Sequence, residues 1–246
     1  MNTSGNTVLI TGGASGIGLA LAKEFYDNKN TVIICGRNRD KLTIAKQLLP
    51  RIHTLECDIT RTDNLTELQA QLGARFPALN ILVNNAGIQI PMDFKEESID
   101  EVLIKYEIDT NFTAQINITN RLLPQLSSQS SSAVVFISSA LARVPKITSP
   151  VYCASKAAIH SFVQSLRVQL LGTPIQVFEV VPDLVETAMT ADRLNASKTK
   201  PEVLANLALK GIRNNNNEIR IGKTGTLFMI DRFVPKLAQH LINKNV

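Results

Sequence analysis

The sequence predicts an α/β fold, with one doubly wound parallel sheet of about seven strands and helices on both of its faces. Short apolar runs rich in Val and Ile alternate along the chain with segments in which apolar residues recur at helical spacing. This alternation is typical of parallel strands joined by right-handed helical crossovers. The chain has 246 residues, 44% apolar and 19% charged, enough apolar material for one large core. We therefore expect a single domain over residues 1–246.

The expected strands are short and end at polar or glycine-containing turns. They are TVLIT, TVIICG, HTLECD, NILVNNAG, AVVFISS, IQVFEVVP and EIRIG, at residues 7–11, 31–36, 53–58, 80–87, 133–139, 175–182 and 218–222. The clearest helical segments between them are residues 19–28, 65–76 and 157–170. A doubly wound sheet binds its ligands beyond the carboxyl ends of its strands, so functional residues are expected there.

A glycine-rich loop follows the first strand, in the stretch TGGASGIGLALA that contains Gly12, Gly16 and Gly18. Without side chains, the backbone N–H groups and the start of the next helix can approach a pyrophosphate. The strict G-x-G-x-x-G spacing is not met, and a glycine cluster alone can be an ordinary turn. The position of this cluster between a strand and an amphipathic helix favours a nucleotide site and a Rossmann-like sheet.

Arg37 stands at the end of the second strand, in CGRN, where a NAD-preferring enzyme would carry Asp or Glu. A guanidinium at this point can donate paired hydrogen bonds to a ribose 2′-phosphate. The residue type therefore predicts NADP(H) as the preferred cofactor, with NAD(H) also possible. The alternative is that Arg37 is an ordinary solvated side chain.

Tyr152 and Lys156 are four residues apart at the start of an apolar helix, so their side chains share one face. An ammonium near a phenol favours the phenolate, and we expect Lys156 to lower the pKa of Tyr152 and make it a usable acid or base. Two further polar residues accompany them. Ser139 lies at the carboxyl end of the fifth strand, and Asn111 lies among apolar neighbours within a helical stretch.

Taken in order, these residues resemble the short-chain dehydrogenase/reductase family over nearly the whole chain. The matching motifs are TGGASGIG, CDIT, NNAG at residues 84–87, PDLVET, and the set Asn111, Ser139, Tyr152 and Lys156. The resemblance implies that Tyr152 is the catalytic acid/base and that Ser139 positions the substrate oxygen. It also implies that Lys156 holds the nicotinamide ribose and that Asn111 supports a proton relay through water.

The same resemblance implies a set of cofactor-binding residues along the carboxyl edge of the sheet. They are Gly12, Ser15, Gly16, Ile17, Gly18, Arg37, Asp58, Ile59, Asn85, Ala86, Gly87, Tyr152, Lys156, Pro182, Val185 and Thr187. The chain departs from the family pattern at Asp183, where a glycine is usual, and we expect this side chain to turn away from the nicotinamide. The phrase PVYCASKAAIHSFVQSLR, the variant PDLVET and the chain ending are similar to the DltE-like subgroup, whose name fixes no substrate.

Two segments near the chain end are expected to shape the substrate site. Residues of about 188–217 follow a strand end and include a charged, small-residue stretch, which favours a substrate lid. Residues of about 224–246 are expected to form a C-terminal helix whose apolar face packs on the domain or on a second subunit. Basic residues beside that face leave open an interfacial membrane helix, although Pro235 argues against it.

Composition argues against several other functions. The net charge of +5 comes from interspersed basic and acidic residues, so it indicates a diffuse surface with a modest attraction for anions and no nucleic-acid site. The cysteines (Cys35, Cys57, Cys153) and histidines (His53, His160, His240) are scattered, and no metal site is expected. No targeting or transmembrane segment is evident, so we expect a cytoplasmic protein.

The function that these residues favour is hydride transfer between NADP(H) and a carbonyl group or secondary alcohol. The substrate is expected to be small and partly apolar, because Ile88, Ile90, Leu141 and Val144 fall near the predicted crevice. The alternative is a nicotinamide-nucleotide sensor that keeps the fold and performs no turnover. By resemblance to the family, the assembly is expected to be a homodimer or homotetramer.

Overall fold

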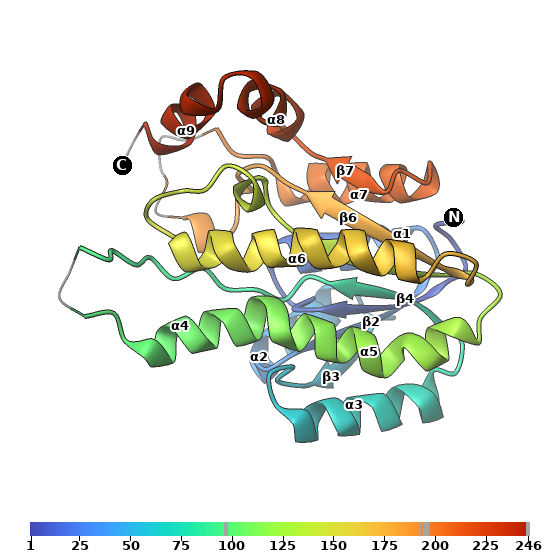
Figure 1. Cartoon of the computed structure of the whole chain (residues 1–246). Coiled ribbons are helices and arrows are strands. Elements are labelled where there is room, and N and C mark those ends of the chain that lie inside the picture. The colour runs from blue at the N-terminus through green and yellow to red at the C-terminus, as the bar shows by residue number, and fades with distance from the viewer. Residues whose placement is uncertain (96–97, 192, 194–196, 245–246) are drawn as a thin grey trace.

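A parallel sheet forms the centre of the computed structural model, which describes residues 1–95, 98–191, 193 and 197–244 (Figure 1). The strands are β1 (Thr7–Thr11), β2 (Thr31–Gly36), β3 (His53–Glu56), β4 (Leu79–Asn84), β5 (Ser132–Ile137), β6 (Ile175–Val181) and β7 (Glu218–Arg220). Their order across the seven-stranded sheet is β3-β2-β1-β4-β5-β6-β7, and each neighbouring pair is parallel. The predicted fold class and each of the seven expected strands are confirmed, with ends that differ by a few residues.

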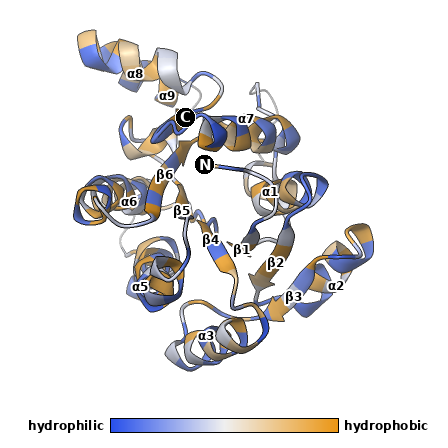
Figure 2. Cartoon of the chain, turned by 90° about the vertical axis from the view of Figure 1, so that its right-hand side faces the viewer, coloured by the Kyte–Doolittle hydropathy of each residue, from blue (hydrophilic) through white to orange (hydrophobic). Residues whose placement is uncertain are grey.

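Helices cover both faces of the sheet, as the alternating pattern predicts (Figure 2). One face carries α1 (Gly16–Asp27), α2 (Arg39–Leu48) and α7 (Pro201–Arg213). The other carries α3 (Thr62–Arg75), α5 (Ala114–Ser127) and α6 (Pro150–Gln169). A further helix, α4 (Glu101–Ile108), runs into α5 through a π-helical turn at Asp109–Thr113.

The two faces have separate apolar cores because successive strand residues point in opposite directions. Val8 and Ile10 of β1 belong to the cluster beneath α1, whereas Leu9 between them belongs to the cluster beneath α5. All three side chains are 0% exposed. Burying a side chain of this size contributes about 1.5–3 kcal/mol, so the paired cores hold the sheet as a rigid support for the residues at its edge.

The strand order places a crevice between β1 and β4. The chain proceeds outward from β1 through β2 to β3, then crosses back to β4 and continues in the other direction. The loops that leave β1 and β4 therefore diverge at the carboxyl edge and leave space between them. The glycine-rich loop follows β1 and the NNAG motif follows β4, so both lie at this crevice.

The C-terminal segment differs from the expected single helix. It forms α8 (Thr224–Phe233) and α9 (Pro235–Asn243), which are separated at Val234. Proline lacks the N–H that would continue α8 and disfavours helical backbone in the preceding residue, which explains the break. Phe228 is buried, whereas Phe233 is 74% exposed, so only part of the predicted apolar face packs on the domain.

The expected lid over residues 188–217 is too long. Within it, α7 packs its apolar face, including Leu204, Ala208 and Ile212, into the core against α1. Among the described residues of this span, those that line the cleft all precede α7, starting with a short 3-10 turn, η3 (Ala188–Thr190). Within the described ranges, no helix is both long enough and apolar enough to cross a membrane.

Candidate active site

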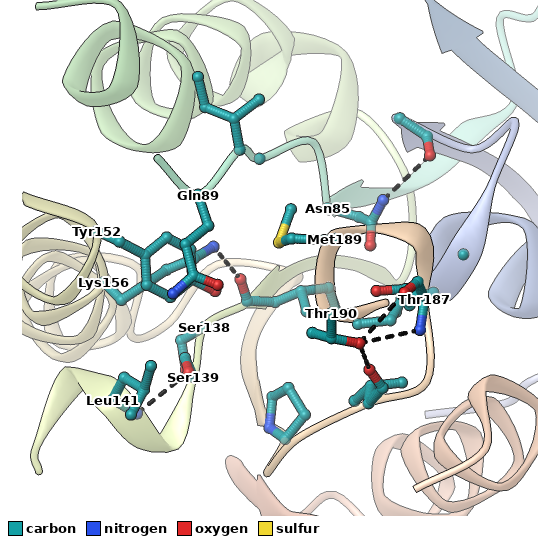
Figure 3. Close-up of a pocket in the computed structure, with 18 of the residues that line it drawn as sticks. Asn85, Gln89, Ser138, Ser139, Leu141, Tyr152, Lys156, Thr187, Met189 and Thr190 are labelled. Carbon is teal, nitrogen blue, oxygen red and sulfur yellow. Dashed lines mark hydrogen bonds between the residues drawn. The ribbon is translucent and has the colours of Figure 1, made fainter. Parts of the chain in front are cut away.

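A cleft of about 1670 Å³ opens beyond the carboxyl ends of the strands (Figure 3). It exceeds the roughly 300–1,000 Å³ of an ordinary small-ligand pocket, so it has room for a dinucleotide together with a substrate. All sixteen residues that the family resemblance implies for the cofactor line it. Ser139 lines it as well, whereas Asn111 does not.

The glycine-rich loop is held close to the end of β4. A Cβ at Gly12 would lie 3.0 Å from the Cα of Ala86, and one at Gly18 would lie 2.3 Å from the carbonyl oxygen of Gly12. The Thr11 hydroxyl accepts hydrogen bonds from the backbone N–H groups of Asn85 (3.0 Å) and Ala86 (3.1 Å). Larger residues at the two glycines would push the loop and the NNAG turn apart.

The start of α1 fits a phosphate group. In the described structure its N-cap residue, Ser15, makes no side-chain capping hydrogen bond, and its first turn contains no acidic residue. The first backbone N–H groups of a helix lack intrahelical partners and carry a partial positive charge, which favours an anion. These groups face the cleft beside Gly16 and Ile17, so the residues present fit a dinucleotide.

Arg37 lies one residue beyond β2 and lines the cleft, and β1 and β4 separate β2 from β5, the strand that precedes Tyr152. Its side chain is exposed, donates a hydrogen bond to the Tyr106 hydroxyl, and lies 5.5 Å from the centroid of the Tyr106 ring. The guanidinium is thus at the cleft surface, with part of its hydrogen-bonding capacity directed at α4.

Tyr152 and Ser139 meet within the cleft. Ser139 ends the segment after β5, where its hydroxyl accepts a hydrogen bond from Leu141 N (3.1 Å), and Tyr152 stands in the first turn of α6. Burial raises the pKa of Tyr152 to about 12, and the Ser139 hydroxyl opposes this shift as a hydrogen-bond partner of the phenol. The expected lowering of the Tyr152 pKa is therefore wrong, because desolvation of the phenol outweighs the other causes.

Lys156 is 3% exposed, and its Nζ donates a hydrogen bond to the carbonyl oxygen of Ile137 at 2.9 Å. The same nitrogen lies 5.7 Å from the centroid of the Tyr152 ring. Burial lowers the pKa of Lys156 to about 8, and the negative charge of Glu179 acts in the opposite direction. Lys156 therefore lies beside Tyr152 as the spacing predicts, but its main described contact is with the backbone of β5.

Asn111 holds the loop that follows the NNAG motif in place. It is fully buried in the π-helical turn, where its Nδ2 donates to Ile88 O and its Oδ1 accepts from Ile88 N, both at 2.8 Å. One turn earlier, Glu107 accepts a hydrogen bond from Ile90 N at 2.9 Å. These two side chains clamp the loop after the NNAG motif on either side of Gln89.

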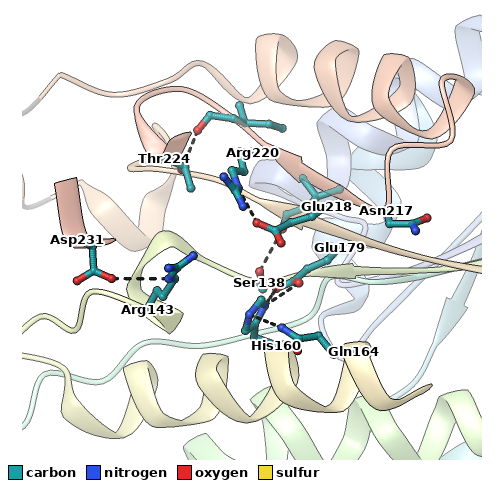
Figure 4. A network of polar contacts seen from close by, with 12 residues as sticks. Ser138, Arg143, His160, Gln164, Glu179, Asn217, Glu218, Arg220, Thr224 and Asp231 are labelled. Atoms are coloured by element: carbon teal, nitrogen blue, oxygen red, sulfur yellow. Dashed lines mark hydrogen bonds and ion pairs between the residues drawn. The ribbon is translucent and has the colours of Figure 1, made fainter. Parts of the chain in front are cut away.

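A polar network that includes Glu179 and His160 joins β6 to α6 (Figure 4). Glu179 of β6 is 1% exposed, and its Oε2 lies 2.9 Å from Nδ1 of His160, one helical turn after Lys156 on α6. This contact raises the pKa of His160. Nearby, Arg143 pairs with Asp231 at 3.7 Å and ties the segment after β5 to α8.

Asp183 lines the cleft after Pro182, and its carboxylate is hydrogen-bonded within the protein. Its Oδ1 accepts a hydrogen bond from the Thr199 hydroxyl (2.7 Å) and its Oδ2 accepts one from Lys223 N (3.0 Å). A Cβ at Gly222 would lie 2.1 Å from this carboxylate, so glycine at 222 leaves room for it. The side chain therefore joins the segment before α7 to the loop before α8.

The sequence interpretation missed two polar residues of the cleft, Gln89 and Arg193, which are hydrogen-bonded to each other at 3.1 Å. No local pattern marks either residue, and they are far apart in sequence. Among the apolar residues expected near the crevice, Ile88 and Leu141 line it, whereas Ile90 and Val144 do not. Leu227, Ile230, Leu241 and Ile242 of the C-terminal helices complete the apolar wall.

Comparisons with known proteins agree with this architecture. A family model described as short chain dehydrogenase matches residues 6–198. The chain is 44% identical over 189 residues to the uncharacterized oxidoreductase DltE of Bacillus subtilis (strain 168), which covers 77% of this chain and 75% of DltE.

Solved structures show the same fold. A short chain dehydrogenase from Burkholderia cenocepacia J2315 in complex with NADP has a TM-score of 0.86 at 21% identity, covering 98% of this chain and 99% of that one. A short chain dehydrogenase/reductase from Burkholderia phymatum in complex with NAD has a TM-score of 0.85 at 18% identity, covering 100% of this chain and 98% of that one. With the matched family model and the relative DltE, the chain belongs to the short chain dehydrogenase family, in its DltE-like subgroup, and is an NAD(P)-dependent oxidoreductase.

Proposed function

We propose that this oxidoreductase uses NADP(H) to interconvert a carbonyl group and a secondary alcohol on a small, partly apolar molecule. The observation that carries the proposal is the meeting of the Tyr152 phenol with the Ser139 hydroxyl in the cleft, beside the buried ammonium of Lys156. Because burial raises the pKa of Tyr152 to about 12, the phenol keeps its proton at neutral pH and can serve as a donor.

In the reductive direction, a reduced nicotinamide held by the residues of the cleft would supply the hydride for the carbonyl carbon. Ser139 donates a hydrogen bond to the carbonyl oxygen and holds it beside Tyr152. Tyr152 gives its proton to this oxygen, which completes the alcohol and leaves a phenolate. The adjacent Lys156 ammonium stabilises that phenolate until a proton returns from solvent. Asn111 contributes by holding the Ile88 backbone next to these groups.

The preference for NADP(H) over NAD(H) is supported by residue type and position. Arg37 follows β2 at the cleft surface, and the next residue, Asn38, uses its side chain to cap α2 through Lys41 N at 2.8 Å. A neutral capping residue beside a guanidinium favours a 2′-phosphate, because no carboxylate competes for the ribose hydroxyls at these two positions.

The test is a screen of aldehydes and ketones for NADPH oxidation, run in parallel on the wild type and on Tyr152→Phe. We expect the variant to bind NADPH like the wild type and to lose at least about a hundredfold in turnover, because phenylalanine keeps the ring but has no proton to donate. Turnover that survives in Tyr152→Phe would contradict the assignment. Cofactor binding without turnover of any compound would favour the nucleotide-sensor alternative.

The assembly and the location of the protein stay predictions. A homodimer or homotetramer in the cytoplasm remains our expectation, and light scattering on the purified chain would measure the assembly. No part of the catalytic proposal depends on a second subunit.

A further inference from the structure

The lining of the cleft includes a guanidinium that the proposed catalytic steps do not use. Arg193 lines the cleft, and its positive charge acts on the phenol of Tyr152, whose pKa it lowers. The surrounding wall is largely apolar, with contributions from Ile88, Leu141, Met189 and Leu227. A partly buried cation in such surroundings has a strong preference for an anionic partner.

Arg193 is attached to a well-anchored turn. Its backbone N–H donates to Thr190 O at 3.2 Å, directly after the short turn η3. Thr190 is 7% exposed, and its hydroxyl donates to Val185 O at 2.6 Å, which fixes the turn against the segment after β6. These two hydrogen bonds therefore fix the backbone from which the guanidinium reaches into the cleft.

Gln89 holds the guanidinium on the opposite side. Its Oε1 accepts a hydrogen bond from Nη2 of Arg193 at 3.1 Å, and its Nε2 donates to the Ser149 hydroxyl at 2.8 Å. Ser149 is the N-cap residue of α6, three residues before Tyr152. Gln89 and Tyr152 appear on the same side of the cleft (Figure 3). Arg193 is thus connected to the helix that carries the proton donor.

The backbone on both sides of Gln89 is fixed. Asn111 holds Ile88 through two hydrogen bonds, and the buried Glu107 accepts one from Ile90 N. An amide side chain on a clamped loop is suited to recognition, because little conformational entropy is lost when a ligand binds. The negative charge of Glu107 also acts on Tyr152, whose pKa it raises, in the opposite direction to the charge of Arg193.

The charges of the cleft also favour an anion. Its described lining includes two carboxylates, and each of them is engaged elsewhere. Asp58 accepts hydrogen bonds from the N–H and hydroxyl of Thr60, and Asp183 binds Thr199 and Lys223 N. Lys146 adds a further basic residue to the same lining. The described lining of the cleft therefore holds more basic than acidic side chains, which favours an acidic ligand end.

We propose that Arg193 and Gln89 bind the anionic end of the substrate, so that the protein acts on small oxo acids or the corresponding hydroxy acids. This assignment rests on the proposed carbonyl chemistry and adds the substrate class. The carbonyl oxygen lies at Ser139 and Tyr152, the carboxylate pairs with the guanidinium fork, and the apolar wall contacts the carbon chain between them. The competing explanation is a structural latch, in which the hydrogen bond between Arg193 and Gln89 only holds these two residues together.

The experiment compares each acid with its own methyl ester, which has the same carbonyl group without the charge. Pyruvate, acetoacetate, succinic semialdehyde and levulinate would be assayed with NADPH beside their esters. For the wild type we expect at least one acid to exceed its ester by about tenfold or more in kcat/KM, since loss of one charge-assisted contact is worth about that factor. Esters that match or exceed every acid would overturn the proposal.

Substitutions separate recognition from a structural latch. In Arg193→Gln, the preferred acid should lose about tenfold or more in kcat/KM, mainly through KM, while its ester changes less than about twofold. Gln89→Glu should show the same selective loss, because its carboxylate would pair with Arg193. The control Lys200→Gln removes an equal charge from the exposed start of α7. It should leave kcat/KM unchanged for both the acid and its ester. An equal loss of kcat/KM for the acid and its ester in Arg193→Gln would show that the contact between Arg193 and Gln89 is only structural.

A binding measurement distinguishes failure of this inference from failure of the proposed function. Succinate and dimethyl succinate would be titrated against the protein–NADPH complex, which needs no turnover. Tighter binding of succinate that disappears in Arg193→Gln would support the anion site even where no oxo acid is reduced. Equal binding of the two compounds would overturn it, even where neutral aldehydes are reduced and the carbonyl chemistry stands.

Discussion

His160 Nδ1 lies 2.9 Å from Glu179 Oε2, in a contact that pairs a partly buried imidazole with a carboxylate that is 1% exposed. The contact lies beneath α6, one helical turn beyond Lys156. Glu179 therefore faces two cationic groups on the same helix, and its negative charge raises the pKa of each of them relative to burial alone. Glu179, which contacts His160 beneath α6, therefore also affects the pKa of Lys156, a proposed catalytic group.

Removing the Glu179 charge should change the pH dependence of turnover. Burial already lowers the pKa of Lys156 to about 8, with Glu179 opposing the shift. In Glu179→Gln, the lysine should lose its proton at a lower pH, and the alkaline limb of kcat/KM should move to lower pH. The profile would be recorded with the best carbonyl compound of the screen.

The matched control is Glu218→Gln on the edge strand β7, whose carboxylate pairs with Arg220 at 2.6 Å and acts on His160 without a resolved effect on Lys156. Its alkaline limb should coincide with that of the wild type. An unchanged limb in Glu179→Gln would mean that Glu179 does not set the charge of Lys156.

Stability should depend on pH through His160. Contact with Glu179 raises the pKa of His160 above its ordinary value of 6.5. The ion pair therefore contributes fully below about pH 6.5, where the imidazole is charged even in the unfolded chain, and the contribution is lost as pH rises through the folded pKa. Relative to His160→Gln, the wild type should gain roughly 1 kcal/mol in acid, a gain that shrinks in mild alkali.

Chemical unfolding of both proteins between acid and mildly alkaline pH would measure this difference. Glutamine can still donate a hydrogen bond to Glu179, so the comparison isolates the charge of the imidazole. A difference in unfolding free energy that stays constant over the whole pH range would show that His160 acts as a neutral hydrogen-bond donor only.

Much of the fold could be predicted from the sequence because its signals are local. Each strand is a short β-branched run, and the glycine-rich loop follows directly after β1, so neighbouring residues contain the information. The spacing of Tyr152 and Lys156 likewise predicts a shared helical face. The break between α8 and α9 was also marked locally, by Pro235, but the breadth of the apolar run favoured one helix.

The parts that could not be predicted depend on contacts between distant segments. Arg193 and Gln89 are separated by 104 positions, and neither belongs to a recognisable pattern. The raised pKa of Tyr152 follows from burial by several loops, which no spacing of residues along α6 can express. The apolar face of α7 also packs against α1, so the α7 part of the expected lid belongs to the core.

Cofactor choice should depend on Arg37. In Arg37→Ala, binding of NADPH should weaken about tenfold or more, because a 2′-phosphate would lose its guanidinium partner, while binding of NADH should change less than about twofold. Paired fluorescence titrations with the two cofactors measure both values. Arg39→Ala removes the same charge from an exposed position outside the cleft and should leave them unchanged. Equal weakening of NADPH and NADH in Arg37→Ala would remove the basis for an NADP(H) preference.

Asp183 should determine how firmly the segment before α7 is held. Its carboxylate accepts hydrogen bonds from the Thr199 hydroxyl and from Lys223 N, so it joins this segment to the start of α8. Asp183→Ala should lower the free energy of unfolding by about 1 to 2 kcal/mol, because it leaves two donors without their described acceptor. It should also speed tryptic cleavage after Lys198, which directly precedes Thr199. Thr199→Val removes only one of the two hydrogen bonds and should give an intermediate cleavage rate. Cleavage of Asp183→Ala at the wild-type rate would show that the apolar contacts of α7 hold the segment without this carboxylate.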